Sequence, residues 1–144
     1  VPRFDFEGLK FVTAHSSVPI MADESCWDSK DALRLVSQRA VDLINIKLMK
    51  CGGLYEAKKI TAIAEAAGVE VMLGCMAEAS GIGVTAAASL GAALKNITRA
   101  DLDATFSLKE LPYEGGFTVK DTRHLILSSD PGLGIKCLKK EMLA

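Results

Sequence analysis

Charged side chains stand where short apolar stretches are expected to end, at four places along the chain. They are Asp23, Lys47, Glu78, and the pair Asp101 and Asp103. Each follows or closes a run of apolar residues short enough to be a strand. In folds built on parallel barrel strands, the catalytic groups lie at the carboxyl ends of those strands. The pattern therefore predicts an enzyme whose chemistry uses a lysine and several carboxylates.

Lys47 closes an expected strand at 43–48. Strand side chains alternate between two faces, so Lys47 shares a face with Leu43 and Asn45 and is expected at the barrel mouth. Asn45 then lies behind Lys47, where it can support the site. A partly desolvated lysine near a cation has a lowered pKa and can act as a general base. The alternative is a surface lysine paired with a loop carboxylate, and the spacing alone leaves both open.

Asp23 ends the preceding strand, expected at 18–23. Carboxylate oxygens at strand ends suit Mg²⁺, which combines a few carboxylates with water and substrate oxygens. An aspartate in this place can equally cap a helix or form a salt bridge. Glu24 has the opposite parity, so we expect it to support Asp23 or to have a structural role.

Asp101 and Asp103 are two residues apart and are expected to face the same way. Two converging carboxylates repel each other unless a metal, a lysine or a substrate ammonium lies between them. An exposed acidic loop is the alternative. Glu78 could instead complement a helix dipole. Cys75 and Met76 are expected to shape a pocket wall rather than to react.

The elements that must position these residues are four successive helix-then-strand units. Strands are expected at 18–23, 43–48, 69–73 and 97–103, and helices at 5–15, from 28 or 29 to about 40, at 54–67 and at 82–94. A repeat of about 25–28 residues matches βα units with parallel strands. A doubly wound sheet could use the same alternation. Polar endings on all four strands favour a barrel, of which about half would be present because a closed (β/α)₈ barrel has eight units.

The pattern changes after residue 107, where turn residues become frequent. Short strands are expected at 117–119 and 125–127, followed by a turn-rich stretch at 130–134. We therefore divide the chain into a half-barrel at 1–107 and a β-containing C-terminal wrap at 108–144.

Composition limits the classes of partner. The chain has 144 residues, 17 basic and 18 acidic side chains and a net charge of −1, which gives no reason to expect nucleic acid or a membrane as partner. The four cysteines are widely spaced and there are two histidines, so neither a zinc site nor a disulfide framework is expected. Reduced thiols indicate a cytoplasmic protein. The first residue is Val1 rather than Met, from which we expect the chain to be part of something longer.

Three segments taken together resemble the enolase superfamily, within the subgroup of muconate-lactonising enzymes and dipeptide epimerases. They are Met21-Ala22-Asp23-Glu24-Ser25, the stretch from Ile46 to Gly53 (Ile-Lys-Leu-Met-Lys-Cys-Gly-Gly), and the stretch from Gly74 to Ser80 (Gly-Cys-Met-Ala-Glu-Ala-Ser). The order and spacing fit, and the similarity covers nearly the whole chain. Asp101-Leu102-Asp103 resembles the Asp-x-Asp signature of dipeptide epimerases.

The resemblance implies a (β/α)₈ TIM-type barrel and a role for each of these residues. Asp23 would be a Mg²⁺ ligand on the fifth strand, Lys47 on the sixth one of two acid/base lysines, and Asp101 with Asp103 the receptor of the substrate's α-ammonium group. Cys75, Met76 and Glu78 would contact substrate. The implied reaction is an isomerisation: a 1,1-proton transfer through a metal-stabilised enolate, which inverts the α-carbon of a dipeptide.

Several features of the family pattern are absent from this sequence. The second-strand lysines, the other Mg²⁺ ligands and the N-terminal capping domain have no counterpart. The chain is therefore expected to be the C-terminal half of the barrel, inactive alone, and to partner either the missing N-terminal half or further copies of itself. Muconate cycloisomerase and o-succinylbenzoate synthase are alternative activities, and a self-associating half-barrel without activity is the non-enzyme alternative.

Overall fold

A four-stranded parallel sheet forms the centre of the computed structural model, which describes residues 1–77 and 80–139. The strands lie in sequence order, β1-β2-β3-β4, and every neighbouring pair is parallel. Their bounds are β1 Met21–Ala22, β2 Leu43–Ile46, β3 Glu70–Gly74 and β4 Ile97–Asp101. Because parallel neighbours must be joined by crossovers, a helix separates each strand from the next. The predicted helix-then-strand repeat is confirmed.

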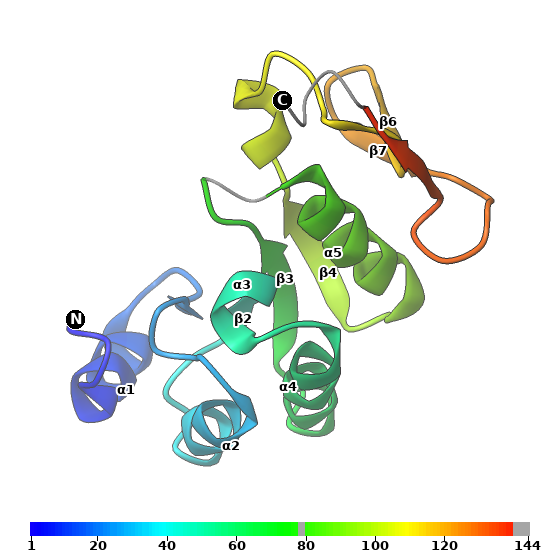
Figure 1. The fold of residues 1–144 in the computed structure, drawn as a ribbon. Helices are drawn as coiled ribbons and strands as arrows, with labels where there is room; N and C mark the ends of the chain where they lie inside the picture. Colours follow the sequence, from blue (N-terminus) through cyan, green and yellow to red (C-terminus); the bar gives the residue numbers. More distant parts are fainter. Residues whose placement is uncertain (78–79, 140–144) are drawn as a thin grey trace.

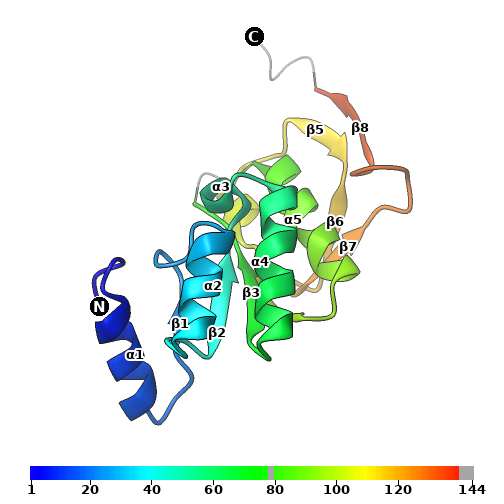
Figure 2. The same ribbon diagram turned by 90° about the horizontal axis from the view of Figure 1, so that it is seen from below.

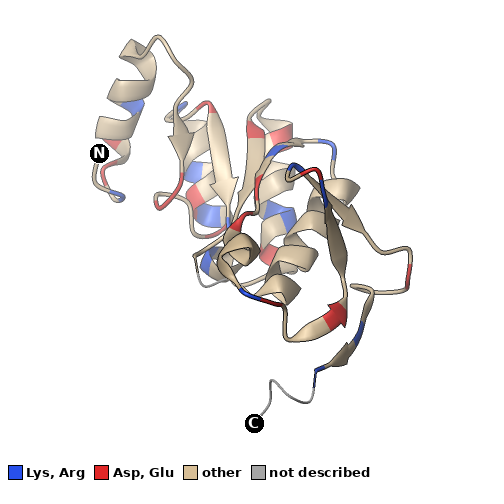
Figure 3. Ribbon diagram, turned by 90° about the horizontal axis from the view of Figure 1, so that it is seen from above, with Lys and Arg blue, Asp and Glu red and all other residues tan. Residues whose placement is uncertain are grey.

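The helices lie along one side of this sheet. They are α1 (Phe6–His15), α2 (Ser29–Ser37), the single turn α3 (Leu48–Cys51), α4 (Leu54–Ala66) and α5 (Gly81–Ala93). Figure 2 shows α2 and α4 in front of the strands, and Figure 3, seen from the opposite side, shows the strands in front. Helices on the outside of a parallel sheet are the arrangement of a (β/α)₈ barrel. Among the described residues, no helix is long and apolar enough to cross a membrane.

Local sequence explains where the helices begin and end. The Asp28 carboxylate accepts hydrogen bonds from the backbone N–H groups of Lys30 and Asp31, each at 2.9 Å, and so caps α2, the helix predicted to begin at 28 or 29. After α4, Gly68 adopts a φ of +71°, which glycine tolerates best. The helices then pack their apolar sides on β2 and β3, and the largest fully buried side chains include Leu35, Ile44, Ile60, Leu73 and Val84. Burying such a side chain contributes roughly 2 kcal/mol.

Three of the predicted strands are shorter than expected. The strand predicted at 18–23 is reduced to Met21–Ala22. Just before it, the N–H of Ile20 donates to the Asp42 carboxylate at 2.7 Å instead of to a neighbouring strand. The strand at 43–48 ends at Ile46, and Lys47 becomes the N-cap of α3. The strand at 97–103 ends at Asp101, because Asp103 is helical and begins the 3₁₀ turn η1 (Ala104–Ser107).

Two antiparallel strand pairs follow η1. The strands β6 (Phe117–Lys120) and β7 (His124–Leu127), expected at 117–119 and 125–127, pair as an antiparallel hairpin that lies beside α5 (Figure 1). The strands β5 (Tyr113–Gly115) and β8 (Ile135–Leu138) also pair, which the sequence analysis missed. Phe117 is buried and joins the core of the sheet and helices. The division into 1–107 and 108–144 stays a prediction.

Candidate functional site

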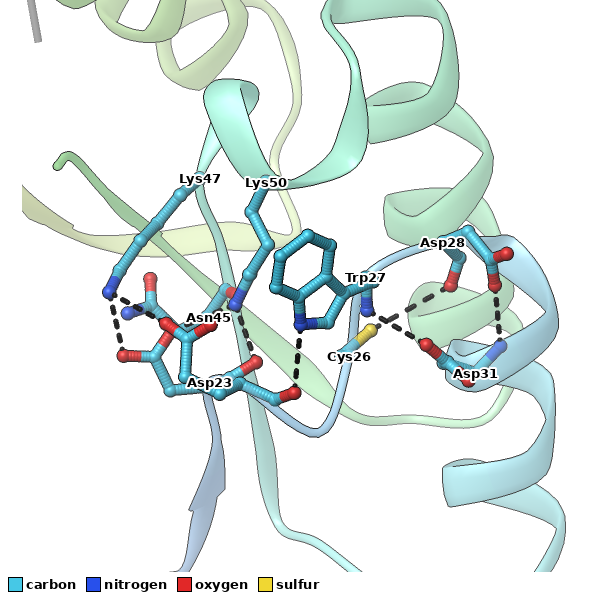
Figure 4. A network of polar contacts seen from close by, with 9 residues as sticks. Asp23, Cys26, Trp27, Asp28, Asp31, Asn45, Lys47 and Lys50 are labelled. Atoms are coloured by element: carbon cyan, nitrogen blue, oxygen red, sulfur yellow. Dashed lines mark hydrogen bonds and ion pairs between the residues drawn. The ribbon is translucent and has the colours of Figure 1, made fainter. Parts of the chain in front are cut away.

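The structure brings Asp23, Glu24 and Lys47 together at the carboxyl ends of β1 and β2. The strands run side by side, with Ala22 opposite Ile44, so the residues that follow them meet. The Lys47 Nζ lies 2.8 Å from Asp23 Oδ2 (Figure 4). The same Nζ lies 3.4 Å from Glu24 Oε1. This cluster places a basic group beside two carboxylates at the edge where barrel enzymes carry their chemistry.

Lys50 completes the cluster, and the sequence analysis missed it. Its Nζ donates hydrogen bonds to three oxygens: the Asp23 carbonyl at 2.5 Å, Asp23 Oδ1 at 2.8 Å and the Asn45 carbonyl at 3.1 Å. The side chain of Lys50 is 1% exposed, against 16% for Lys47 and 42% for Asp23. The signal that could have identified Lys50 is its spacing from Lys47, because residues three apart lie on the same side of a helical turn.

A single helical turn makes this geometry possible. Lys47 still has an extended backbone and is the N-cap of α3. Gly52, with a φ of +83°, ends α3 after one turn. The chain therefore reverses directly after β2, and Lys50 reaches back to the loop that follows β1.

The ion pairs move the pKa values of both partners. Partial burial raises the pKa of the Asp23 carboxyl, but hydrogen bonds from Lys47 and Lys50 outweigh this effect and hold it below 3.8. The hydrogen bond to Asp23 raises the pKa of Lys47 above 10.5, and its burial opposes this only in part. The direction of this shift follows from the neighbours of Lys47, which are carboxylates and favour the charged form. A lowered Lys47 pKa beside a bound cation stays a prediction.

Asn45 lies beside the cluster with its side chain buried. It is 5% exposed, and its Oδ1 has no hydrogen-bond partner among the described residues. Gly74 on the neighbouring strand leaves room for it, because a Cβ there would come within 2.7 Å of that oxygen. A buried amide oxygen without a partner is uncommon in folded proteins.

The ends of β3 and β4 carry the second group of predicted residues. Cys75 Sγ lies 3.4 Å from the Asp101 carbonyl oxygen and 3.6 Å from Asp103 Oδ1. Asp101 and Asp103 are exposed, with the buried Leu102 between them. Both carboxylates line a groove of about 510 Å³.

Cys75 and Met76 connect the two groups. Together with Lys47 they line one small cleft. Burial raises the pKa of the Cys75 thiol above 9.0, so it is neutral at pH 7. The structure therefore sets the predicted residues in a row along the carboxyl edge of the sheet. Glu78 lies outside the described residues.

A second thiol, that of Cys26, is buried in the same loop as Asp23. Cys26 follows Asp23 in the loop after β1 and is 1% exposed, with its Sγ 3.8 Å from the Asp28 carbonyl oxygen. Burial raises its pKa to about 12. Cys26 is therefore a packing residue, not a nucleophile.

The donor set fits Mg²⁺ at one point. The Asp23 carboxylate is a hard oxygen donor, and its Oδ2 already contacts a cationic group, the Lys47 ammonium. Residues 1–77 and 80–139 contain no group of three or more His, Cys, Asp or Glu side chains that could hold a metal ion. Asp23 therefore fits as one ligand of a set whose other members lie elsewhere.

Comparison with known proteins gives one consistent result. Residues 1–141 match the family described as enolase C-terminal domain-like. The chain is 59% identical over 135 residues to the hydrophobic dipeptide epimerase of Enterococcus faecalis, covering 94% of this chain and 38% of that protein. It is 48% identical over 136 residues to the L-Ala-D/L-Glu epimerase of Clostridium acetobutylicum, covering 94% of this chain and 37% of that one.

The fold agrees with these relatives. The crystal structure of the dipeptide epimerase from Enterococcus faecalis V583, complexed with Mg and the dipeptide L-Leu-L-Tyr, superimposes with a TM-score of 0.91 at 58% identity. The match covers 95% of this chain and 39% of that one. The predicted fold class, part of a (β/α)₈ barrel, is confirmed. The chain spans about 38% of the length of the E. faecalis relative.

Proposed function

We propose that this chain, which belongs to the enolase C-terminal domain-like family, supplies the C-terminal part of the active site of a Mg²⁺-dependent dipeptide epimerase. The observation that carries the proposal is the cluster of Asp23, Lys47 and Lys50 at the ends of β1 and β2. It offers a carboxylate oxygen and a lysine ammonium side by side at the edge expected for catalysis. The similarity to dipeptide epimerases over most of the chain supports the same conclusion.

Lys47 is proposed as an acid/base group that moves a proton at Nζ to or from the substrate's α-carbon. While its Nζ is bound to Asp23 Oδ2 it is protonated, because the pKa is raised. In that state it can donate a proton but cannot accept one. To act as a base, Lys47 must first leave Asp23 and lose its proton. A second lysine, on the opposite face of the substrate, completes the 1,1-proton transfer.

Asp23 is proposed as one ligand of the Mg²⁺ ion. When bound, the metal acts as a Lewis acid on the substrate carboxylate, which makes the neighbouring α-proton easier to remove. Asp23 contributes one carboxylate, and Glu24 and Asn45 stand next to it and Lys47. The remaining ligands, like the second lysine, are proposed to come from the part of the relatives' length that this chain does not span. For this reason the 144 residues alone are expected to be inactive.

Asp101 and Asp103 are proposed to receive the α-ammonium group of the dipeptide. Both residues are exposed and line the same groove, so a cation in that groove can reach each of them. Cys75 holds its thiol against both residues and is proposed, with Met76 and Glu78, to form the substrate-facing wall. This feature favours a dipeptide over muconate or succinylbenzoate, which carry no ammonium group.

The test is an exchange experiment with the protein as its gene encodes it. A panel of dipeptides is incubated in D₂O with Mg²⁺, and incorporation of deuterium at the α-carbon is followed by mass spectrometry. We expect exchange and inversion for a subset of the dipeptides, abolished by chelation with EDTA. Absence of exchange with every dipeptide would overturn the proposed reaction.

Asn substitutions at the two exposed aspartates test the substrate class. In the Asp101→Asn, Asp103→Asn double variant, we expect kcat/KM to fall about 10- to 100-fold for dipeptides. The reason is that both proposed contacts between a carboxylate and the α-ammonium group of the bound substrate are lost. A substrate without an ammonium group should be unaffected by the same change. Equal kcat/KM for the variant and the wild type on dipeptides would favour the cycloisomerase alternative.

A further inference from the structure

The ammonium group of Lys50 is buried, whereas that of Lys47 belongs to a more exposed side chain. The Lys50 side chain is 1% exposed, whereas that of Lys47 is 16% exposed. A buried ammonium is unfavourable unless oxygens surround it. Here three oxygens do so: two belong to Asp23 and one to Asn45. Lys50 therefore joins the loop after β1 to the end of β2 from inside the protein.

The two oxygens of the Asp23 carboxylate consequently have different neighbours. Oδ1 accepts from the buried Lys50 at 2.8 Å, and Oδ2 accepts from the more exposed Lys47 at 2.8 Å (Figure 4). Lys50 also holds the Asp23 carbonyl oxygen at 2.5 Å. Two contacts to one residue, at the side chain and the backbone, fix both the position and the rotation of the carboxylate. Oδ2 is left with Lys47, the more exposed of the two lysines, as its partner.

We propose that Lys50 is a positioning residue that holds Asp23 through Oδ1 and keeps Oδ2 presented to a cation at the mouth of the site. Lys47 and a divalent ion then share the same oxygen, so that an ion on Oδ2 releases the Lys47 ammonium from its partner. Lys50 touches neither substrate nor metal. The inference rests on the proposed function, because it concerns how Asp23 is prepared for a metal.

The experiment measures Mg²⁺ affinity, with MgCl₂ alone as the probe, by isothermal titration calorimetry on the protein as its gene encodes it. In Lys50→Met the hydrogen bonds to Asp23 are lost, and we expect the Kd for Mg²⁺ to rise about 10- to 100-fold, as for other partners that orient metal ligands. The ammonium itself repels a second cation, but we expect the loss of orientation to dominate. Lys58→Met, a change at an exposed lysine on α4, is the matched control and should leave the Kd unchanged.

Two further variants keep the test decisive if Lys50→Met does not fold. Lys50→Gln retains a polar group but is too short to hold both Asp23 oxygens, and it should show the same loss of affinity. Lys50→Arg retains the charge and the donors and should restore part of it. A merely structural role would lower the melting temperature of the Mg²⁺-free protein and leave the Kd unchanged, and this result would overturn the inference. A wild-type protein that binds no Mg²⁺ would overturn the proposed function instead.

Discussion

At the ends of β1 and β2, Asp23 is bound by two lysines, whereas at the ends of β3 and β4 the carboxylates of Asp101 and Asp103 face solvent. Within residues 1–77 and 80–139, neither of these two aspartates forms an ion pair. The Cys75 Sγ lies 3.6 Å from Asp103 Oδ1, whereas its contact with Asp101, at 3.4 Å, is to the backbone carbonyl oxygen and not to the carboxylate. One edge of the same sheet thus carries a cluster whose charges are already matched, beside a cluster whose negative charge is not.

This difference indicates how the two clusters would work. Matched charges hold a side chain in one place before any ligand arrives, which is the preorganisation that catalytic groups require. Unmatched, exposed carboxylates attract a cation from solution and select for it. The first cluster is therefore suited to chemistry and the second to recognition, and the following changes test this division.

Loss of the Lys47 ammonium should have the largest effect. In Lys47→Met, measured as kcat for dipeptide epimerisation in the protein as its gene encodes it, we expect a fall of about 10²- to 10⁴-fold, the usual contribution of an acid/base group. The free energy of unfolding should change by only about 0–1 kcal/mol, because this lysine forms the more exposed ion pair. A variant that retains wild-type kcat would remove Lys47 from the mechanism.

Loss of the Asp23 charge should destabilise the fold, and loss of the Asp103 charge should not. In Asp23→Asn the buried Lys50 ammonium keeps only neutral partners, and we expect the free energy of unfolding to fall by about 3 kcal/mol. Asp103→Asn is the control on the solvent side, where we expect a change within about 0.5 kcal/mol. Urea denaturation measures both. Equal effects would contradict the distinction between the two clusters.

A methyl group at Gly74 should clash with the buried Asn45 side chain, which lies beside the first cluster. A Cβ at this position would lie 2.7 Å from Asn45 Oδ1 and 3.0 Å from its Nδ2. Such overpacking in Gly74→Ala should lower the free energy of unfolding by about 1–3 kcal/mol and displace the Asn45 side chain. Gly83→Ala is the control, because its Cβ would find Ser80 Oγ at 3.8 Å and no closer atom. Equal melting temperatures for the two variants would show that the Asn45 side chain can move aside at no cost in stability.

The smallest expected effect is the contribution of the Glu56 carboxylate to the stability of the fold at acidic pH. The Glu56 carboxylate on α4 accepts hydrogen bonds from Ser29 Oγ at 2.5 Å and Ser29 N at 2.9 Å, which tie it to α2. These bonds, together with one from Lys59, lower the pKa of Glu56 from 4.5 to about 2. A lowered folded-state pKa stabilises the fold above the unfolded-state value, and this stabilisation is lost as pH falls from about 4.5 toward 2.

Glu56→Gln isolates that contribution. The urea midpoint of the wild type should fall over this pH range more steeply than that of the variant, because the variant has no carboxylate to protonate at this position. Both should respond equally to pH between 5 and 7, where Glu56 stays ionised. Parallel midpoints down to pH 2 would show that the bond to Ser29 does not contribute.

The sequence predicted the elements better than it predicted the site. Alternation and spacing sufficed for the order of the strands and for the approximate ranges of the helices between them, because both depend on local backbone chemistry. Lys50 was missed because its neighbours Lys47 and Leu48 were assigned to a longer strand. Only the turn α3, ended by Gly52, points its ammonium inward.

The pairing of the C-terminal strands was missed for a similar reason. The pairing of β5 with β8 joins segments about 20 residues apart, and no local signal specifies such a partner. The pKa of Lys47 likewise depends on which group faces it across β1 and β2. Residue type and parity locate a lysine at a strand end, but the sign of its pKa shift depends on neighbours brought together by the fold.

The buried thiol of Cys26 makes the opening of the loop after β1 measurable by chemical labelling. Because Cys26 is 1% exposed and its pKa is raised to about 12, an alkylating reagent can reach it as a thiolate only when the loop opens. Exposed Cys137, in contrast, reports the reagent's unhindered rate in the same tube. The ratio of the two labelling rates therefore measures how often the loop that carries Asp23 and Cys26 opens.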